Sequence, residues 1–357
     1  TCNSSTFFEI FNELFKLFLD FVLGIQKRYS SSYLVWKSFP MKPKAIVIGC
    51  SGQDGSYMVK SLLLKGYEVI GTSRSKKILH SNHKALGISN QFLVHQVDNL
   101  NSSQISDLIV TEKPSEIYNL AAQSSVGKSF LEPLTTEQSI VEASEVLLSN
   151  CIKHDFNGRI FFAGSSEVYG LTEQPAKIDS TFNPQNPYAN AKLKSMNLVK
   201  KYRKEYGIKA VTGVLFPHES PLRTKQFVTR KIIDAAKSCN LDKSLKIEFG
   251  NLNISRDWGW AEEYVEAMYL INNRKSEVKD HIVCTGILTS LETFIDKAFK
   301  YFNLNWKDHI IINKKYFRST DIEKSFGDPT QILNDLQWES KKDIDSIIKN
   351  LINSNSY

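Results

Sequence analysis

From residue 44 onward, short apolar runs alternate with longer segments in which apolar residues recur every three or four positions. The short runs predict buried strands, and the longer segments predict amphipathic helices. Strands that alternate with helices are typical of a parallel sheet covered by helices on both faces. We therefore predict an α/β fold with a Rossmann-like parallel sheet. Its strands are expected at residues 45–48, 67–72, 92–97, 116–120, 159–163 and 210–215.

Beyond residue 215 the alternation loosens, which indicates a change of architecture. We expect one domain over residues 41–215 and a smaller α/β domain mainly over residues 216–357, with some segments returning to the first sheet. The helices that the periodicity predicts lie at residues 133–154, 227–238, 261–272, 291–302 and 342–352.

Residues 1–40 differ from the rest of the chain. Apolar and aromatic residues dominate positions 7–25, but acidic and basic residues interrupt them. The segment is therefore too charged to span a bilayer, and it lacks the basic start and small-residue cleavage site of a signal peptide. Because Met41 directly precedes the first predicted strand, we expect residues 1–40 to be an extraneous or weakly ordered segment, and we assign no function to it.

The composition is that of an ordinary globular protein, with 41% hydrophobic and 23% charged residues and a net charge of +7. This charge suits an anionic ligand. No Lys/Arg-rich block of the kind that binds a nucleic-acid backbone is present, so we expect no nucleic-acid partner. The five cysteines are scattered and lack metal-ligand spacing. We expect them to be reduced, mostly buried thiols of a cytoplasmic protein without a metal site.

The first predicted strand runs directly into residues 49–55 (GCSGQDG), which open a helix. Glycines at this spacing let the backbone turn tightly and approach a pyrophosphate, whose charge lies at the helix N-terminus. A strand before the glycines and a helix after them make this a strong dinucleotide signal. The GxxGxxG spacing is similar to that of short-chain dehydrogenases/reductases. The residues expected to bind the cofactor there are Gly49, Gly52, Gln53, Asp54 and Gly55.

Residues at the ends of the next strands favour NADP as the cofactor. An NAD-specific fold usually has an acidic residue after the second strand, whereas this chain has Arg74, which favours a 2′-phosphate. The third strand leads to Asp98, which can accept from the adenine amino group. Small residues after the fourth strand let a cofactor approach the backbone. We expect contacts from Leu120, Ala121, Ala122, Gln123 and Ser124.

The candidate catalytic residues are Ser165, Glu167, Tyr188 and Lys192, which follow the fifth predicted strand. The i, i+4 spacing places Tyr188 and Lys192 on one face of a helix. Because the ordinary pKa of tyrosine is near 10, we expect Lys192 and a positively charged nicotinamide to lower it. Tyr188 can then take a proton from a sugar hydroxyl that Ser165 holds.

Glu167 separates the alternative reactions. A dehydrogenase, epimerase or reductase needs only the tyrosine, the lysine and the hydroxyl. Elimination of water from a sugar also needs a base for a carbon-bound proton and an acid for the departing hydroxyl, and one carboxylate can do both in turn. The presence of Glu167 therefore favours dehydration.

Several segments resemble the GDP-mannose 4,6-dehydratase family of extended short-chain dehydrogenases/reductases, and the likeness extends from about residue 44 to the C-terminus. Two of the motifs, HESP and RDWG, are not general to the superfamily, so they favour this family over its relatives. The segments that carry the resemblance are 49–57 (GCSGQDGSY), 119–124 (NLAAQS), 164–170 (GSSEVYG), 188–192 (YANAK), 215–223 (LFPHESPLR), 227–232 (FVTRKI) and 256–259 (RDWG).

The resemblance implies a redox-neutral reaction that gives GDP-4-keto-6-deoxy-mannose. NADP oxidises C4 of the mannose, Glu167 removes the C5 proton, water leaves from C6 and the hydride returns there. The family also implies that Lys192, His218 and Arg223 contact the cofactor, and that subunits pair into a homodimer or homotetramer. The residues expected to bind the nucleotide sugar are Ser125, Glu167, Arg230, Lys231, Arg256 and Arg318, with Arg256 on the diphosphate.

Two departures from the family pattern affect the site. Ser165 stands where threonine is common, which preserves the hydroxyl, whereas Pro217 replaces an asparagine and removes an amide and a backbone N–H. The alternatives that remain are a 4,6-dehydratase, epimerase or reductase that acts on another nucleotide sugar, and a non-catalytic NADP-binding regulatory protein. Ser166-Glu167 weighs against dTDP-glucose, because enzymes for that substrate typically carry Asp-Glu here.

Overall fold

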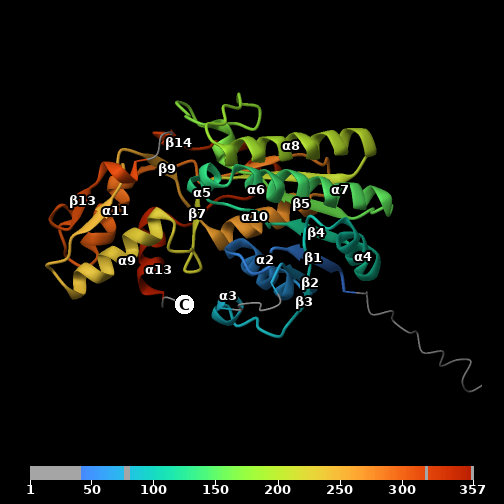
Figure 1. Ribbon diagram of the computed structural model, residues 1–357, viewed down its shortest axis with the longest axis horizontal. Helices are drawn as coiled ribbons and strands as arrows, with labels where there is room; N and C mark the ends of the chain where they lie inside the picture. The colour runs from blue at the N-terminus through green and yellow to red at the C-terminus, as the bar shows by residue number, and fades with distance from the viewer. Residues whose placement is uncertain (1–41, 76–80, 318–320, 355–357) are drawn as a thin grey trace, which may run out of the picture. The chain divides into compact units, whose positions relative to one another are not determined.

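The computed structural model describes residues 42–75, 81–317 and 321–354. A sheet of parallel strands in the spatial order β11-β6-β5-β4-β1-β2-β3 forms its centre (Figure 1). The Rossmann-like sheet predicted from the sequence is therefore confirmed. The strands are β1 (Lys44–Ile48), β2 (Glu68–Ser73), β3 (Leu93–Gln96), β4 (Glu116–Asn119), β5 (Arg159–Ala163), β6 (Lys209–Leu215) and β11 (His281–Val283).

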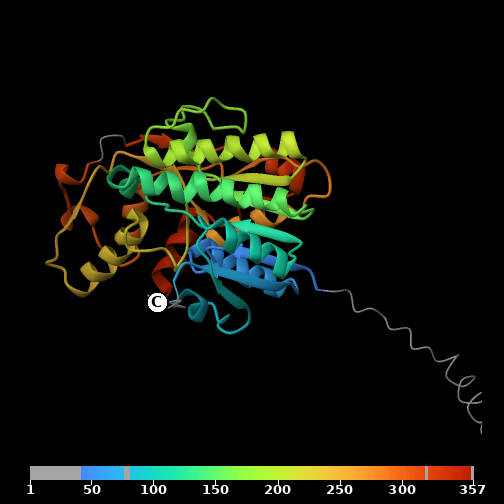
Figure 2. The same cartoon turned by 45° about the vertical axis from the view of Figure 1, so that its right-hand side comes forward.

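Helices cover both faces of this sheet because alternate residues of each strand point to opposite sides. On β1, Ala45 and Val47 join a core that includes residues of α2 (Gln53–Leu64) and α10 (Ala261–Asn273). Ile46 and Ile48 join a second core. That core includes residues of α4 (Ser102–Glu112), α7 (Ala143–Lys153) and α8 (Pro187–Tyr206), and Figures 1 and 2 show α7 and α8 side by side.

The long helix expected at 133–154 is interrupted. It consists of α6 (Pro133–Glu137), a π-helical turn (Gln138–Glu142) and α7. Serine hydroxyls bond backbone carbonyls around the turn: Ser139 Oγ donates to Thr136 O and Ser144 Oγ donates to Ile140 O. Single π-helical turns inside helices are frequent near functional sites, and Ser139 lines a cavity described below.

The C-terminal part has a core of its own, formed by α9 (Val228–Leu241), α11 (Leu291–Lys300) and α13 (Ile344–Asn353). One strand of this part, β11, lies in the main sheet beside β6. Residues 43–357 form one compact unit, so the boundary at residue 215 stays a prediction.

The remaining elements are short. The expected helices 227–238, 261–272, 291–302 and 342–352 are found with shifts of at most three residues at their ends. The other helices and strands are α3 (Ser81–Ala85), α5 (Val126–Leu131), α12 (Thr330–Leu336), β7 (His218–Glu219), β8 (Ile247–Phe249), β9 (Ser255–Asp257), β10 (Gly259–Trp260), β12 (Leu288–Ser290), β13 (Ile310–Ile312) and β14 (Lys324–Ser325), with 3₁₀ turns at Ser166–Tyr169, Trp306–Asp308 and Lys314–Tyr316.

None of the helices within the described ranges is long and apolar enough to cross a membrane. A search of the same residues finds no cluster of three or more His, Cys, Asp or Glu side chains that could hold a metal ion. Four cysteines in the described part of the chain are buried free thiols, and burial raises the pKa of Cys50 and of Cys151 to about 12. Residues 1–40 lie outside the described ranges.

Candidate active site

Two adjoining cavities lie at the carboxyl ends of β1, β4, β5 and β6. The strand order reverses between β1 and β4, which is where ligands bind in open α/β sheets. The cavities have volumes of about 340 Å³ and about 580 Å³, and we call them the catalytic cavity and the nucleotide cavity. They form one continuous groove because they share the lining residues Gly52, Leu120, Ala122, Ser124, Ser125 and Gln226.

The glycine loop between β1 and α2 packs so closely that side chains would not fit. Gly49 has a φ of +84°, and a Cβ there would lie 2.8 Å from the Ala121 backbone. A Cβ on Gly55 would lie 2.1 Å from the Gly49 carbonyl oxygen. Gly52 is the N-cap residue of α2, and no side chain accepts a hydrogen bond from the first turn of this helix. The backbone N–H groups of that turn can therefore bind a ligand in the groove. This loop fits a pyrophosphate.

The nucleotide cavity holds the residues predicted to contact the nucleotide: Gly49, Gly52, Arg74, Asp98, Leu120, Ala121, Ala122, Gln123 and Ser124 line it. Arg74 and Asp98 are both exposed. The side chain of Gln123 is engaged with the chain itself: its Nε2 donates to Ser125 O at 2.9 Å and to Thr136 Oγ1 at 3.1 Å. Gln123 therefore orders the loop after β4, in addition to lining the cavity.

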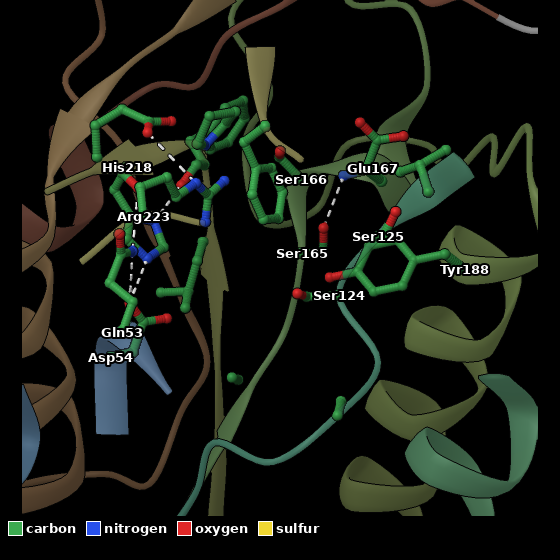
Figure 3. Close-up of a pocket in the computed structure, with 18 of the residues that line it drawn as sticks. Gln53, Asp54, Ser124, Ser125, Ser165, Ser166, Glu167, Tyr188, His218 and Arg223 are labelled. Carbon is green, nitrogen blue, oxygen red and sulfur yellow. Dashed lines mark hydrogen bonds and ion pairs between the residues drawn. The ribbon is translucent and has the colours of Figure 1, made fainter. Parts of the chain in front are cut away.

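The catalytic cavity brings Ser165, Glu167, Tyr188 and Lys192 together. Figure 3 shows Ser165, Glu167 and Tyr188. Ser165 lies two residues after the end of β5. Its Oγ accepts from the Glu167 N–H at 3.3 Å, which caps the turn Ser166–Tyr169. Tyr188 and Lys192 lie on the first turns of α8. Lys192 Nζ donates to the Ala163 carbonyl at 2.7 Å and lies 5.8 Å from the centre of the Tyr188 ring.

The expected lowering of the Tyr188 pKa by its surroundings is not found for the chain by itself. Burial raises the pKa of Tyr188 to about 12, and the nearby Glu167 carboxylate adds to the rise, although a hydrogen bond with Ser165 and the Arg223 cation oppose it. Burial also lowers the pKa of Lys192 to about 8, which the Asp54 carboxylate partly offsets. Burial exceeds the favourable charges here because both groups are inside the protein.

The opposite wall of the catalytic cavity is a network around His218 (Figure 3). His218 Nε2 lies 3.0 Å from Asp54 Oδ1, and Nδ1 lies 2.7 Å from the Phe216 carbonyl. Since a carbonyl and a carboxylate can only accept, both ring nitrogens donate and the imidazole carries a positive charge. Gln53 completes the network, because its Nε2 donates to Asp54 at 3.0 Å and its Oε1 accepts from Ser220 at 2.8 Å.

Charges within this network set the two pKa values. Burial would raise the pKa of Asp54. The His218 cation, the hydrogen bonds from His218 and Gln53, and the Arg223 cation outweigh burial and lower this pKa to about 2. Burial would lower the pKa of His218, but the Asp54 carboxylate and the bond to Phe216 outweigh burial and raise it. Arg223 in turn lies 3.3 Å from the buried carboxylate of Glu219 and stacks 3.5 Å from the centre of the Phe227 ring.

Comparison with known proteins is consistent with this geometry. The family model described as GDP-mannose 4,6 dehydratase matches residues 46–351. The chain is 38% identical over 330 residues to GDP-mannose 4,6 dehydratase 1 of Arabidopsis thaliana, covering 87% of this chain and 90% of that protein. The chain belongs to the GDP-mannose 4,6-dehydratase family.

Solved structures with lower identity share the fold. A UDP-glucose 4-epimerase from Thermus thermophilus in complex with NAD matches with a TM-score of 0.75 and 19% identity over 87% of this chain and all of that one (100%). RMD from Pseudomonas aeruginosa complexed with NADPH matches with a TM-score of 0.73 and 19% identity over 87% of this chain and 98% of that one.

The residues expected to bind substrate divide into two groups. Ser125, Glu167 and Arg256 line the catalytic cavity. Arg230 and Lys231 do not line this cavity, and their role in substrate binding stays a prediction. The buried Arg230 bonds Asp234 at 3.0 Å and the Pro221 carbonyl at 3.1 Å, and Lys231 donates to the Glu248 carbonyl at 2.7 Å. Arg318 lies outside the described residues.

The sequence analysis predicted this helix but did not assign the first residues of α9 to the site. Phe227, Val228 and Thr229 line the catalytic cavity, and α9 begins there without a side-chain cap. The Thr229 hydroxyl is buried and, among the described residues, has no hydrogen-bond partner. An uncapped helix N-terminus is attractive to an anion. The signal in the sequence is Phe227, which has no side-chain acceptor to cap the helix that follows it.

Proposed function

We propose that this protein is a GDP-mannose 4,6-dehydratase that uses NADP. The observation that carries the proposal is the position of Glu167 in one cavity with Ser165, Tyr188 and Lys192. A carboxylate beside the residues that oxidise a hydroxyl is what an elimination requires in addition to a redox step. Membership of the family supports the same reaction and the nucleotide sugar as substrate.

The groove fits a nicotinamide dinucleotide. The glycine loop would hold the pyrophosphate, Asp98 would accept from the adenine, and Arg74 would bind the 2′-phosphate of NADP. When bound, the cofactor would supply the hydride acceptor for C4 of the sugar and the hydride donor for C6. One structural neighbour is a complex with NAD and another with NADPH, so the choice of NADP rests on Arg74.

The chain's own residues would move two protons. Tyr188 takes the proton of the C4 hydroxyl, which Ser165 holds, and its pKa of about 12 means that added positive charge is needed to lower it. Lys192 lies on the next turn of the same helix and can supply part of that charge. Glu167 removes the C5 proton and passes it to the C6 hydroxyl, which leaves as water. The proton held by Tyr188 then replaces the one lost from C5 when the hydride is restored at C6.

The substrate diphosphate would lie between Arg256 and the start of α9. A guanidinium can donate two parallel hydrogen bonds to a phosphate, and the unpartnered Thr229 hydroxyl with the first amides of α9 can donate from the other side. In this arrangement residues 41–215 hold the cofactor and the catalytic groups, and residues 216–357 mainly hold the substrate. We further propose that the protein is cytoplasmic, since the described cysteines are free thiols. We also propose that it forms a homodimer or homotetramer, as its resemblance to the family implies.

The test is incubation of the purified protein and NADP with GDP-mannose, dTDP-glucose and UDP-glucose in separate reactions. Mass spectrometry would detect loss of water, and NMR would identify the keto-sugar. We expect turnover of GDP-mannose. Turnover of another nucleotide sugar alone would overturn the substrate assignment, and turnover of none would favour a non-catalytic protein.

A further inference from the structure

We propose that Asn186 positions Glu167 for the elimination step; this inference rests on the proposed function. Asn186 directly precedes Pro187 and Tyr188, and 3% of its surface is exposed. It does not line the catalytic cavity, but its side chain lies behind the cavity wall and contacts Glu167. Asn186 is therefore a positioning residue, because it acts on the substrate through another residue.

Two hydrogen bonds fix the orientation of the Asn186 amide. Its Oδ1 accepts from the Ala189 N–H at 2.8 Å, which caps α8. Since a backbone N–H can only donate, the oxygen must face Ala189 and the nitrogen must face Glu167. The Nδ2 group donates to Glu167 Oε2 at 2.9 Å. One side chain thus links the carboxylate to the helix that carries Tyr188.

Backbone contacts hold the two segments in register. The Asn183 N–H donates to the Val168 carbonyl at 2.9 Å. Gly170 has a φ of +65°, and a Cβ there would lie 2.4 Å from the Asn183 carbonyl oxygen. Asn186 itself is extended, with φ −150° and ψ 163°, as a residue before proline prefers. The contact between Asn186 and Glu167 is therefore determined by the fold on both sides.

The chemical consequence follows from what an amide can do. The Nδ2 group can only donate, so it bonds the carboxylate oxygen and holds the carboxylate that takes the C5 proton in one orientation. It also engages Oε2 and leaves Oε1 for the sugar. The proton removed from C5 moves to Oε1 as the C5–H bond breaks. The same proton then moves to the C6 oxygen as the C6–O bond breaks and water forms.

Two substitutions separate this role from helix capping. Asn186→Ser and Asn186→Asp both keep an oxygen that caps α8. Serine is too short to replace the amide bond to Glu167, and aspartate puts a second carboxylate against it. The matched control is Asn190→Ser, an exposed asparagine one turn further along α8 whose Nδ2 donates to the Asn186 carbonyl.

Rapid mixing of enzyme, NADP and GDP-mannose would measure the two halves of the reaction separately. Absorbance of the reduced cofactor reports C4 oxidation, and mass spectrometry of quenched samples reports loss of water. We expect wild-type oxidation rates in Asn186→Ser, with elimination slower by roughly 10- to 100-fold, which is the effect of losing one hydrogen bond to a charged group. Reduced cofactor would then accumulate, and Asn186→Asp would be slower still.

Three outcomes would contradict these expectations. Wild-type elimination rates in Asn186→Ser would overturn the inference alone. A proportional loss of oxidation and elimination would overturn it too, because it would indicate a purely structural role in capping α8. Failure of the wild-type protein to dehydrate GDP-mannose would overturn the proposed function, and the inference with it.

Discussion

The wall of the catalytic cavity formed by β5 and α8 carries hydroxyls and one carboxylate, whereas the facing wall carries ionised pairs. On the first wall, burial dominates and raises the pKa of Tyr188 to about 12. On the second wall, His218 and Asp54 face each other at 3.0 Å, and the pKa of Asp54 falls to about 2. The first wall contains groups that change their protonation during a reaction, and the second contains groups whose charges are fixed.

This difference shows that one wall of the cavity holds the groups for proton transfer, and that the other wall holds ion pairs that fix the structure. Groups that exchange protons in catalysis need a pKa that their surroundings can tune, whereas a strong ion pair holds both partners in their charged forms. The paired groups have another effect: Gln53, Asp54 and Ser220 connect the glycine loop of α2 to the segment after β6. The second wall therefore joins the cofactor part of the chain to the substrate part.

The largest effect is expected on the first wall, from Glu167→Gln. Loss of the carboxylate should slow dehydration by about two to four orders of magnitude, which is the usual contribution of a general acid–base group. Oxidation at C4 should persist, because it needs Tyr188. Mass spectrometry of the product and absorbance of the reduced cofactor would check both rates. The control is Glu173→Gln, a carboxylate with 70% of its side chain exposed, and dehydration by Glu167→Gln at the wild-type rate would refute the assigned role.

Arg256→Ala should give the next largest effect, on substrate binding. Loss of a hydrogen-bonded charge costs about 1.5–3 kcal/mol, so KM for GDP-mannose should rise roughly 10- to 150-fold. Steady-state kinetics with saturating NADP would measure it. Arg256→Lys should recover only part of the loss, since a lysine cannot donate two parallel bonds. An unchanged KM would exclude Arg256 from the diphosphate site.

Arg230→Ala should instead lower stability. Its guanidinium is buried and bonds Asp234 and the Pro221 carbonyl, so its removal should destabilise the fold by about 1–3 kcal/mol. KM for GDP-mannose should change less than in Arg256→Ala. Denaturant unfolding and kinetics on the same preparation would test this. A large rise in KM without loss of stability would instead place Arg230 in the substrate site.

Asp54→Asn tests the ion pair of the second wall. The pKa of His218 is raised above its ordinary 6.5, so its contribution to stability is present below about pH 6.5 and is lost as pH rises through the folded value. The pKa of Asp54 is lowered from 3.8 to about 2, so its contribution is present above pH 3.8 and is lost as pH falls through 2. The stability of the wild-type protein should therefore exceed that of Asp54→Asn by the largest amount between pH 3.8 and pH 6.5.

Thermal unfolding of both proteins from acidic to mildly alkaline pH would measure that window. NMR of the His218 ring should show a lower pKa in the variant, because burial is then no longer offset by a carboxylate. This is the smallest of the four effects, since the pair does not take part in the chemistry. Stability curves that run parallel at all pH values would show that His218 is not charged in the folded protein.

Six of the seven strands of the central sheet, and the residues at their ends, follow from the sequence alone. Alternating apolar runs define buried strands, and a residue that directly follows a parallel strand must lie at the carboxyl edge. Gly49, Asp98, Leu120 and Ser165 were placed correctly for that reason. The i, i+4 spacing also placed Tyr188 and Lys192 on one helix face, independent of the rest of the fold.

Only the tertiary structure decided which polar groups meet across the groove. Basic residues in the segment 218–231 have the same local pattern, yet Arg223 faces the cavity and Arg230 bonds Asp234, because the direction of a side chain depends on how α9 packs. The pairing of His218 with Asp54 joins residues 164 positions apart. Charge and spacing along a chain carry no information about such contacts, since they depend on how distant segments pack in three dimensions.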